Sequence, residues 1–232
     1  MKDFLTVVIP CKNESTYIAD TLLSLNNQSG MKDVRVIIAD ANSDDGTVDI
    51  INSLSGLMRF NIELIEGGPV SVGRNNGAKL CTTPYILFLD ADTQFKKKTT
   101  IRKSLSKMFR GYKLVTCRLK SRSYSFLSKL AFYIFNITHP TINEAFAPGL
   151  YFMTDMESFV KYGMFDETVT QSEDFLLSKK YKKSQFYIMN HYVTQDDRRF
   201  KKMGYIKFIK LLILNYFNKN NIEHFKKNVN YW

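Results

Sequence analysis

The chain has 232 residues, with 33 lysines and arginines against 22 aspartates and glutamates, a net charge of +11, 44% hydrophobic residues and 14% aromatic residues. This apolar content excludes a disordered chain, and the length suffices for one substantial domain with a large core. The three cysteines, Cys11, Cys81 and Cys117, lie far apart without paired spacing, which argues against a disulfide framework or a cysteine-rich zinc site and favours a reducing compartment.

The first part of the chain alternates between strand-like and helix-like segments. Apolar runs without polar alternation, typical of parallel strands buried on both faces, cover residues 4–9, 34–39, 60–65 and 85–89. Segments with helical character, each preceded by cap or turn residues, cover residues 16–26, 47–55 and 72–80. This order predicts an α/β fold with a Rossmann-like, doubly wound, mostly parallel sheet, in which ligands bind beyond the carboxyl ends of the strands.

Polar residues follow three of these predicted strands. They occupy residues 10–14 after the first strand, 40–47 after the second and 90–92 after the fourth. Any one segment would pass as ordinary turn or helix-cap chemistry, but three carboxylate-bearing segments at one edge of a sheet indicate a ligand site. Asp90-Ala91-Asp92 places two carboxylates directly after a buried strand, and hard cations prefer such oxygen ligands.

The order and spacing of several segments resemble the family 2 glycosyltransferases. The matching segments are residues 8–14, 40–47, 73–77, 90–92, 163–167 and 172–174, and the resemblance as a whole spans residues 4–204. It implies a GT-A fold and an inverting enzyme. Such an enzyme transfers a sugar from a nucleotide-diphosphate donor, UDP- or GDP-linked, to a hydroxyl or phosphate acceptor.

The resemblance also implies which residues hold the donor. They are Pro10, Lys12, Glu14, Asp40, Arg74, Asp90 and Ala91, together with Arg198 and Arg199 in a late basic loop. An ionised Asp40 facing a base edge would accept a hydrogen bond from an N–H donor such as that of uracil. Simpler roles stay open: a helix-dipole carboxylate for Glu14, a bridge between surface acids for Arg74, and ordinary surface charge for the late arginines.

Metal and catalytic residues are implied in the same way. Asp92 is the implied direct ligand of a Mn²⁺ or Mg²⁺ ion that also contacts the donor diphosphate, and His191 is a further candidate for holding it. Glu173 and Asp174 match the catalytic pair, with Asp174 as the base that takes the proton from the acceptor hydroxyl. From the residues alone, a helix start capped by Ser172 explains the two acids equally well.

The charge divides unevenly along the chain. Residues 1–94 contain seven basic and twelve acidic residues, whereas residues 95–232 contain 26 basic and 10 acidic residues. We therefore expect one GT-A domain over residues 1–204, with a nucleotide-sugar-binding half at 1–94 and an acceptor-binding half at 95–204. Residues 205–232 are expected to form a basic, amphipathic helical tail, which either docks on the core or lies in a membrane interface.

The sequence also bears on location and partners. No apolar stretch reaches the ~20 residues that a membrane span needs, and no signal peptide is expected. We expect a cytoplasmic protein that contacts the cytoplasmic face of a membrane peripherally and acts on a glycan or a lipid-linked acceptor. The scattered lysines come without a nucleic-acid-binding signature, so we expect no DNA or RNA partner.

Two other functions stay open from the sequence. A nucleotidyltransferase would share the nucleotide-binding sheet and the metal, but residues 10–14 contain no glycine, unlike the glycine- and lysine-rich loop typical of that class. A catalytically inactive nucleotide-sugar-binding protein would carry the same motifs. The sugar, the base and the acceptor depend on pocket shape, which motifs do not encode.

Overall fold

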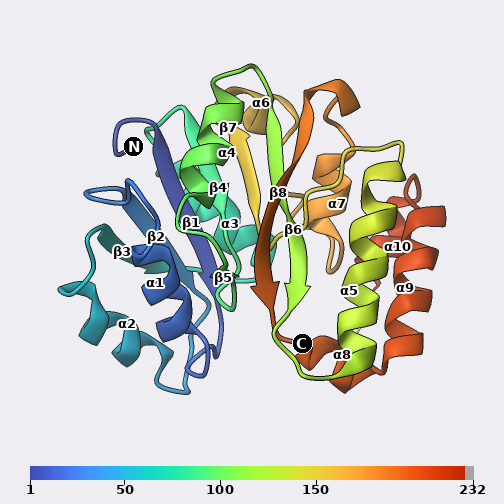
Figure 1. The fold of residues 1–232 in the computed structure, drawn as a ribbon, viewed down its shortest axis with the longest axis horizontal. Helices are drawn as coiled ribbons and strands as arrows, with labels where there is room; N and C mark the ends of the chain where they lie inside the picture. Colours follow the sequence, from blue (N-terminus) through green and yellow to red (C-terminus); the bar gives the residue numbers. More distant parts are fainter. Residues whose placement is uncertain (228–232) are drawn as a thin grey trace.

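An eight-stranded sheet crosses the computed structural model, with the strand order β3-β2-β1-β4-β7-β6-β8-β5 (Figure 1). The structure describes residues 1–227, except for the side chains of Arg199, Phe200, Tyr205, Phe208 and Ile209. The strands are β1 (Leu5–Cys11), β2 (Arg35–Asp40), β3 (Asn61–Glu66), β4 (Tyr85–Phe88), β5 (Gln94–Phe95), β6 (Leu114–Ser121), β7 (Phe152–Asp155) and β8 (Phe186–Gln195). The α-helices are α1 (Ile18–Asn26), α2 (Thr47–Ser55), α3 (Val70–Lys79), α4 (Thr100–Met108), α5 (Phe126–Thr138), α6 (Met156–Lys161), α7 (Glu173–Ser178), α8 (Arg198–Met203), α9 (Tyr205–Phe217) and α10 (Ile222–Lys226).

The first half of the chain forms the parallel part of the sheet, as predicted. β1 pairs in parallel with β2 and β4, and β2 pairs in parallel with β3. The predicted strands and helices of this half agree with β1 to β4 and α1 to α3 to within two residues at every end. Helix α3 lies close against β1, because a Cβ atom on Gly77 would overlap the side chain of Val8.

The second half adds mixed pairings that the sequence did not indicate. β7 lies between β4 and β6 and is antiparallel to both. β6 and β8 are parallel, with a register shift between Cys117 and Arg118, and the short β5 closes the edge antiparallel to β8. Four of the seven pairings are therefore parallel, which makes this a mostly parallel, mixed α/β sheet.

Apolar side chains cover both faces of the sheet. In β1, Leu5, Val7 and Ile9 belong to a core layer with residues of α1, α2, α4 and α5. Val8 belongs to the opposite layer, with residues of α3, α6 and α7. Because each face is covered by helices, the central strands carry apolar residues at successive positions, and this explains the unbroken apolar runs of the sequence.

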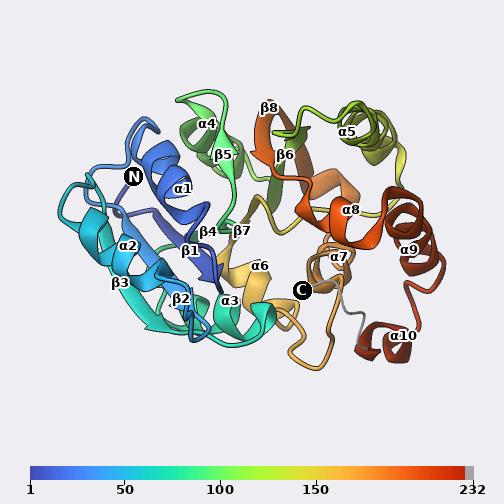
Figure 2. The same ribbon diagram turned by 90° about the horizontal axis from the view of Figure 1, so that it is seen from below.

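The C-terminal helices pack beside α7 (Figure 2). Phe225 of α10 is fully buried against Val169 and Leu176, and its carbonyl oxygen accepts a hydrogen bond of 2.9 Å from the backbone N–H of Thr170. Residues of α9 and α10 thus lie on the core, while the domain boundary expected at residue 204 stays a prediction. Among the described residues, no helix combines the length and the apolar character needed to cross a bilayer.

Candidate active site

The loops after β1 and β2 form one hydrogen-bonded unit around Asp40. Ser43 donates to the two carboxylate oxygens of Asp40 from its backbone N–H (2.9 Å) and its hydroxyl (2.5 Å), and the thiol of Cys11 donates to the same carboxylate (3.3 Å). Burial and the charge of Asp40 raise the pKa of the Cys11 thiol, so it stays protonated. Asp40 is therefore held rigidly at the carboxyl end of β2.

The loop that follows β1 is fixed in the same way. The backbone N–H of Asn13 donates to the Ser43 hydroxyl (2.9 Å), and the backbone N–H of Glu14 donates to the Thr47 hydroxyl (2.8 Å). Asn13 has a φ of 53°, a left-handed conformation that asparagine tolerates better than most residues. The polar segments after β1 and β2 were predicted to lie together, and the structure brings them into contact.

Arg74 connects the predicted donor motif to the predicted catalytic motif. This fully buried guanidinium on α3 donates to the carboxylate of Asp90 (2.7 Å) and to that of Glu173 (2.6 Å), 99 positions away. Burial alone would lower the pKa of Arg74, but the negative charges of Asp90 and Glu173 raise it above its usual value. The ring of Phe165 lies below the guanidinium, with its centroid 5.1 Å from Cζ.

Asp174 lies next to this ion pair at the start of α7. Its carboxylate accepts hydrogen bonds from the backbone N–H groups of Gly149 (2.7 Å) and Phe175 (2.7 Å). Burial, together with the neighbouring charge of Glu173, raises the pKa of Asp174 to about 7. A carboxyl group with this pKa can release and accept protons near neutrality, which is the property required of a general base.

The two carboxylates of the Asp90-Ala91-Asp92 segment have different partners. Asp90 pairs with Arg74, whereas Asp92, 2% exposed, has an oxygen 3.5 Å from the guanidinium of Arg198. Arg198, on α8, also binds the carboxylate of Glu14 with both terminal nitrogens, one of them at 2.8 Å. Residues 184 positions apart are thus joined at the candidate donor site.

A tyrosine lies under this arginine. The ring centroid of Tyr17 is 4.9 Å from Cζ of Arg198 and 5.1 Å from Cζ of Arg122, so two guanidinium groups contact one ring. Desolvation would lower the pKa of Arg198, but Glu14 and Asp92 raise it, so the side chain stays charged. A cluster therefore forms from Glu14, Tyr17, Asp92 and Arg198. In it, the guanidinium of Arg198 lies next to Asp92, the predicted metal ligand.

The side chains at this place suit a divalent metal ion that takes one ligand, Asp92, from the protein and its other ligands from the donor diphosphate and water. The carboxylate of Asp92 is buried and already faces a positive group, as a metal ligand would. Within residues 1–227, no group of three or more histidine, cysteine, aspartate or glutamate side chains is arranged to hold a metal. One carboxylate with phosphate oxygens and water is a normal environment for Mg²⁺.

His191, the second predicted metal residue, lies against the start of α4. Its Nδ1 is 3.0 Å from the hydroxyl of Thr100, and its ring is buried. Burial, with the charges of Lys97 and Lys103, lowers the pKa of His191, so the ring is neutral near pH 7. A neutral imidazole can coordinate a metal, but positive neighbours disfavour a cation here, and the metal role of His191 stays a prediction.

The other predicted donor residues are placed as follows. Pro10 lies in β1, paired with Ala39 of β2, and Lys12 is exposed in the loop that follows. Ala91 is buried, and its carbonyl oxygen accepts a 2.6 Å hydrogen bond from Thr21. The side chain of Arg199 lies outside the described residues.

Two supporting residues were not predicted from the sequence. Gly149 donates to Asp174, and a Cβ atom at this position would overlap the guanidinium of Arg74. Asn75, next to Arg74, bonds through its amide to the backbone of Phe165 on both sides (2.9 and 3.2 Å). The pair Pro148-Gly149 is a turn signal that marks Gly149 in the sequence, whereas nothing local to Asn75 indicates its partner.

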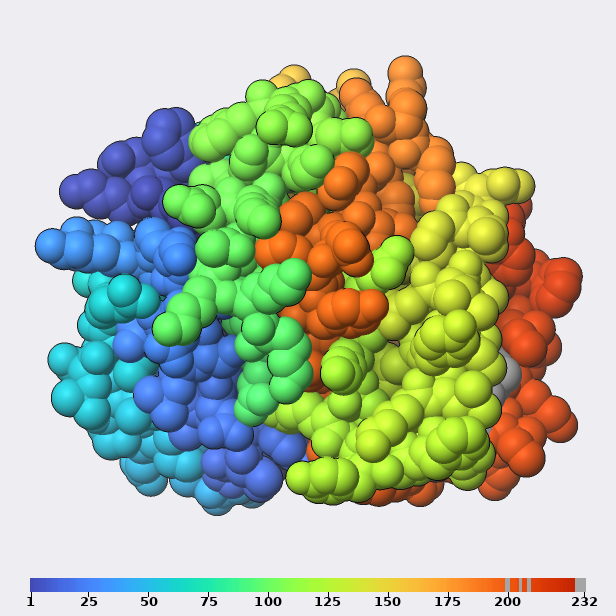
Figure 3. All heavy atoms as spheres, in the orientation of Figure 1, coloured from blue at the N-terminus to red at the C-terminus, as the bar shows by residue number. Residues whose placement is uncertain are grey.

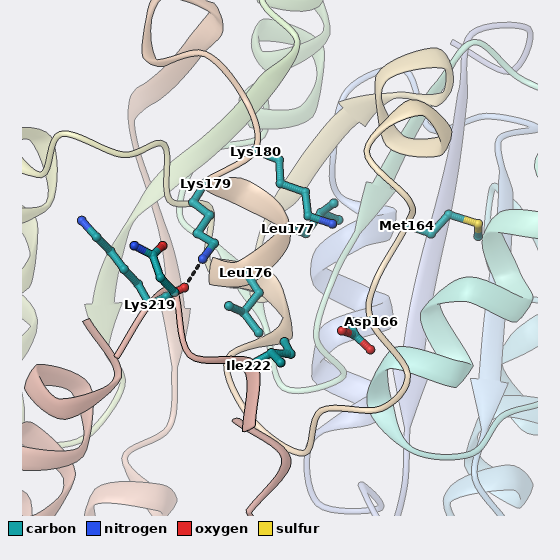
Figure 4. Close-up of a pocket in the computed structure, with 9 residues that line it drawn as sticks. Met164, Asp166, Leu176, Leu177, Lys179, Lys180, Lys219 and Ile222 are labelled. Atoms are coloured by element: carbon teal, nitrogen blue, oxygen red, sulfur yellow. Dashed lines mark hydrogen bonds between the residues drawn. The ribbon is translucent and has the colours of Figure 1, made fainter. Parts of the chain in front are cut away.

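A cavity of about 190 Å³ lies on the far side of α7 and contains none of the predicted site residues. It is lined by Met164, Asp166, Leu176, Leu177, Lys179, Lys180, Lys219, Asn220 and Ile222. Figure 4 shows Lys179 reaching the carbonyl oxygen of Lys219, and this contact ties α7 to the turn after α9. The site residues converge instead at the carboxyl ends of the strands.

Solved structures share this fold. The TarS 1-349 fragment of S. aureus in complex with UDP-GlcNAc has a TM-score of 0.64 and 18% identity, over 83% of this chain and 58% of that chain. The mannosyltransferase PcManGT from Pyrobaculum calidifontis, in complex with GDP-Man and Mn²⁺, has a TM-score of 0.68 and 16% identity, over 90% of this chain and 64% of that chain. The fold is therefore of the GT-A type.

Sequence similarity leads to the same group of proteins. The poly(ribitol-phosphate) beta-N-acetylglucosaminyltransferase TarP of Staphylococcus aureus (strain N315) is 36% identical over 91 residues, which cover 38% of this chain and 28% of TarP. The chain thus spans less than two thirds of TarP and of the two structural neighbours. The model of the family described as Glycosyl transferase family 2 matches residues 6–168, more than half of the chain. The chain belongs to glycosyl transferase family 2.

Proposed function

We propose that this protein transfers a sugar from a nucleoside-diphosphate donor to an acceptor, with inversion at the anomeric carbon. The observation that carries the proposal is the buried contact of Arg74 with both Asp90 and Glu173. This contact puts the predicted donor motif and the predicted base, Asp174, on two sides of one guanidinium. If each motif only stabilised its own part of the fold, the two motifs would not need to be in contact.

The nucleoside would lie over the loops after β1 and β2, with Asp40 facing the base. Its carboxylate is already fixed by Ser43, so little further ordering is needed on binding. One structural neighbour binds UDP-GlcNAc and another binds GDP-Man, which supports a nucleotide-sugar donor for this chain and leaves the base open.

Asp92 would hold a divalent cation together with the donor diphosphate. When bound, such a cation neutralises the charge that develops on the departing nucleoside diphosphate. Mn²⁺ in the PcManGT complex supports this, and Mg²⁺ has the same preference for oxygen ligands. Arg198, which now contacts Asp92 and Glu14, would turn to the phosphate oxygens of the donor.

Asp174 would act as the general base. Its carboxylate takes the proton of an acceptor hydroxyl while that oxygen bonds to the anomeric carbon, and the bond from this carbon to the diphosphate oxygen breaks. A single in-line displacement inverts the configuration and needs no enzyme nucleophile. Glu173 would orient the site through Arg74 and keep the pKa of Asp174 near neutrality.

The acceptor is expected to be a glycan that carries phosphate, either lipid-linked or a cell-surface polymer. The excess of basic residues after position 95 supports an anionic acceptor. The name of TarP, a transferase acting on poly(ribitol-phosphate), is consistent with that class. We also propose a cytoplasmic location, with peripheral contact to a membrane.

The proposal is tested by donor binding and by turnover. Nucleotide sugars with Mn²⁺ or Mg²⁺ should raise the melting temperature, because they bind only the native state. Asp92→Asn should remove most of the metal-dependent part of this shift, since a neutral amide is a weaker ligand for a hard cation. Asp174→Asn should keep the shift and abolish transfer.

Asp49→Asn, an exposed change on α2, serves as the matched control and should leave both binding and transfer unchanged. If no nucleotide sugar stabilises the protein, the proposed donor is wrong, and if Asp174→Asn turns over normally, Asp174 is not the base. Binding without turnover by the wild type under all donors and acceptors would indicate an inactive binding protein.

A further inference from the structure

Helix α5 is apolar on its outer side as well as on its inner side. Inward, Phe132 is buried in the core, and the amide of Asn136 exchanges hydrogen bonds of 3.0 and 2.7 Å with the backbone of Leu119 in β6. These contacts fix which side of the helix faces out. The outward residues are Phe126, Leu127, Leu130, Tyr133, Ile134 and Ile137, with exposed fractions from 39% to 75%.

This outer stripe is unusual for a surface helix. Its residues follow one another at spacings of one or three positions, so they form a continuous strip along one side of α5. A surface helix normally presents charged or polar residues there, and contiguous apolar patches of this kind mark interaction sites. Tyr124, just before the helix, is 96% exposed and extends the strip.

Helix α9 adds a second exposed apolar strip. Ile206, Ile213, Leu214 and Phe217 are exposed, the last by 79%. Figures 1 and 2 both show α5 and α9 on the same end of the molecule, and in Figure 3 the atoms of α5 cover the front of that end while those of α9 form its edge. We call these two exposed strips the α5–α9 surface.

The segments that form this surface carry basic residues and no acidic ones, and the acidic Glu144 beside α9 is paired with Lys219. Residues 118–138 contain four basic residues and residues 198–217 contain six, and neither segment contains an aspartate or glutamate. A second copy of the same surface would bring like charges together, which disfavours self-association through it. An anionic partner with an apolar interior satisfies both the charges and the apolar side chains.

The surface adjoins the candidate active site. Arg122, two residues before Tyr124, contacts the same Tyr17 ring as Arg198, which binds Glu14 in the donor site. A partner seated on the α5–α9 surface would therefore lie close to the candidate donor site.

We propose that the α5–α9 surface docks on an anionic lipid bilayer. The apolar side chains of both helices enter the boundary between headgroups and acyl chains, and the flanking lysines and arginines contact lipid phosphates. The contact holds the active site at the membrane surface, where a lipid-linked acceptor is found. The proposal rests on the peripheral membrane contact proposed above and names the surface that makes it; its failure is distinguishable from failure of the transfer reaction, because docking is measured without a nucleotide sugar.

The test is co-sedimentation of the full chain with vesicles of phosphatidylcholine alone or mixed with phosphatidylglycerol. The wild type should sediment mainly with the anionic vesicles. Tyr133→Ser with Ile137→Ser, and separately Phe217→Ser, should reduce the bound fraction severalfold. Lys207→Glu with Lys210→Glu should weaken binding at least fivefold per lysine, because each basic residue near an anionic membrane contributes about 1 kcal/mol.

Matched controls come from the opposite half of the molecule. Leu57 follows α2 and is 71% exposed, so Leu57→Ser removes a similar apolar side chain away from the α5–α9 surface. Lys2→Glu with Lys32→Glu makes the same change of charge at two exposed lysines away from that surface. These controls should bind like the wild type, and all variants should keep its melting temperature and its shift with nucleotide. The proposal is overturned if the wild type stays in the supernatant, if controls and variants behave alike, or if ultracentrifugation without vesicles shows a dimer that the serine variants abolish.

Discussion

At the scale of single residues, the buried guanidinium of Arg74 organises the site. Its two terminal nitrogens form ion pairs with Asp90 (2.7 Å) and Glu173 (2.6 Å). Removing one partner of such a buried pair typically costs about 4 kcal/mol of folding free energy, because the remaining charge is left without compensation. Arg74 also lowers the pKa of Asp174, against the larger effects of burial and Glu173.

The first prediction concerns the pH dependence of transfer. Asp174 must be ionised to accept a proton, and its pKa in the free protein is raised to about 7. The value of kcat/KM should therefore rise with pH through this region and level off above it. Glu173→Gln removes a negative neighbour, so the rising limb should move to lower pH in that variant.

Initial rates from pH 5 to 9 at a fixed donor concentration below KM measure this limb. Asp49→Asn should give the wild-type profile, because its exposed carboxylate lies on α2 outside the proposed catalytic pair. A flat profile over this range would contradict the assignment of Asp174 as the base.

At the scale of elements, α9 supports the start of α7. The buried amide of Asn215 donates to the hydroxyl of Ser172 (2.9 Å), and its oxygen lies 2.8 Å from Nε2 of His224 in α10. Ser172 has a φ of 55° and directly precedes Glu173. The C-terminal helices thus hold a left-handed residue whose conformation sets where the two proposed catalytic acids, Glu173 and Asp174, lie.

The second prediction follows from this support. Asn215→Ala leaves the Ser172 hydroxyl and the His224 ring without their partner, which should lower the free energy of unfolding by about 2 kcal/mol. Because Asp174 is then positioned less tightly, kcat should fall roughly tenfold or more, while the dissociation constant of the donor changes little.

Asn218→Ala, directly after the same helix, is the control, since its side-chain amide donates to the carbonyl of Leu214 within α9 and forms no hydrogen bond with α7 among the described residues. It should leave kcat unchanged. Equal loss of donor affinity and kcat in Asn215→Ala would point to general unfolding rather than to a positioning role.

The elements also show what the sequence can and cannot predict. β1 to β4 were predictable because strands buried on both faces leave continuous apolar runs. β7 has only four residues, and its place between β4 and β6 results from pairings distant in the chain. No local pattern encodes such pairings.

The same contrast holds for the site. Asp40, Asp90 and Asp92 were predictable because polar residues after parallel strands gather at one edge. The contacts of Arg74 with Glu173 and of Arg198 with Glu14 span 99 and 184 positions and depend on how the second half folds back. The spacing of motifs in the sequence therefore predicts which side chains belong to the site, but it does not predict which side chains they contact.

At the scale of the whole molecule, the charge division of the chain becomes a division in space. The acidic first half supplies Glu14, Asp40 and Asp92, while the basic second half closes over them with Arg198. Opposite charges thus meet at the site, and the remaining basic residues of the α5–α9 surface face outward. On the two proposals above, the same sequence asymmetry would serve donor binding at one place and membrane docking at another.

The third prediction concerns global stability and His139. Its ring is 1% exposed at the end of α5, where Nε2 donates to the carbonyl of Phe146 (2.6 Å). Burial lowers the pKa of His139 from 6.5 to about 4. The unfolded chain therefore binds a proton more readily than the folded protein, so this group's contribution is present above pH 6.5 and is lost as the pH falls towards 4.

Between pH 7.5 and pH 5 the contribution of His139 should fall by about 2 kcal/mol. Because the pKa of Asp174 is raised, its protonation increases the free energy of unfolding as the pH falls over part of this range. The effect of His139 is therefore measured as the difference between the wild type and a variant that lacks this histidine. His139→Gln keeps an N–H donor for Phe146 but does not titrate. Urea unfolding of both proteins at the two pH values should show the wild type losing about 2 kcal/mol more than the variant, and equal losses would mean that His139 is accessible to protons in the folded state.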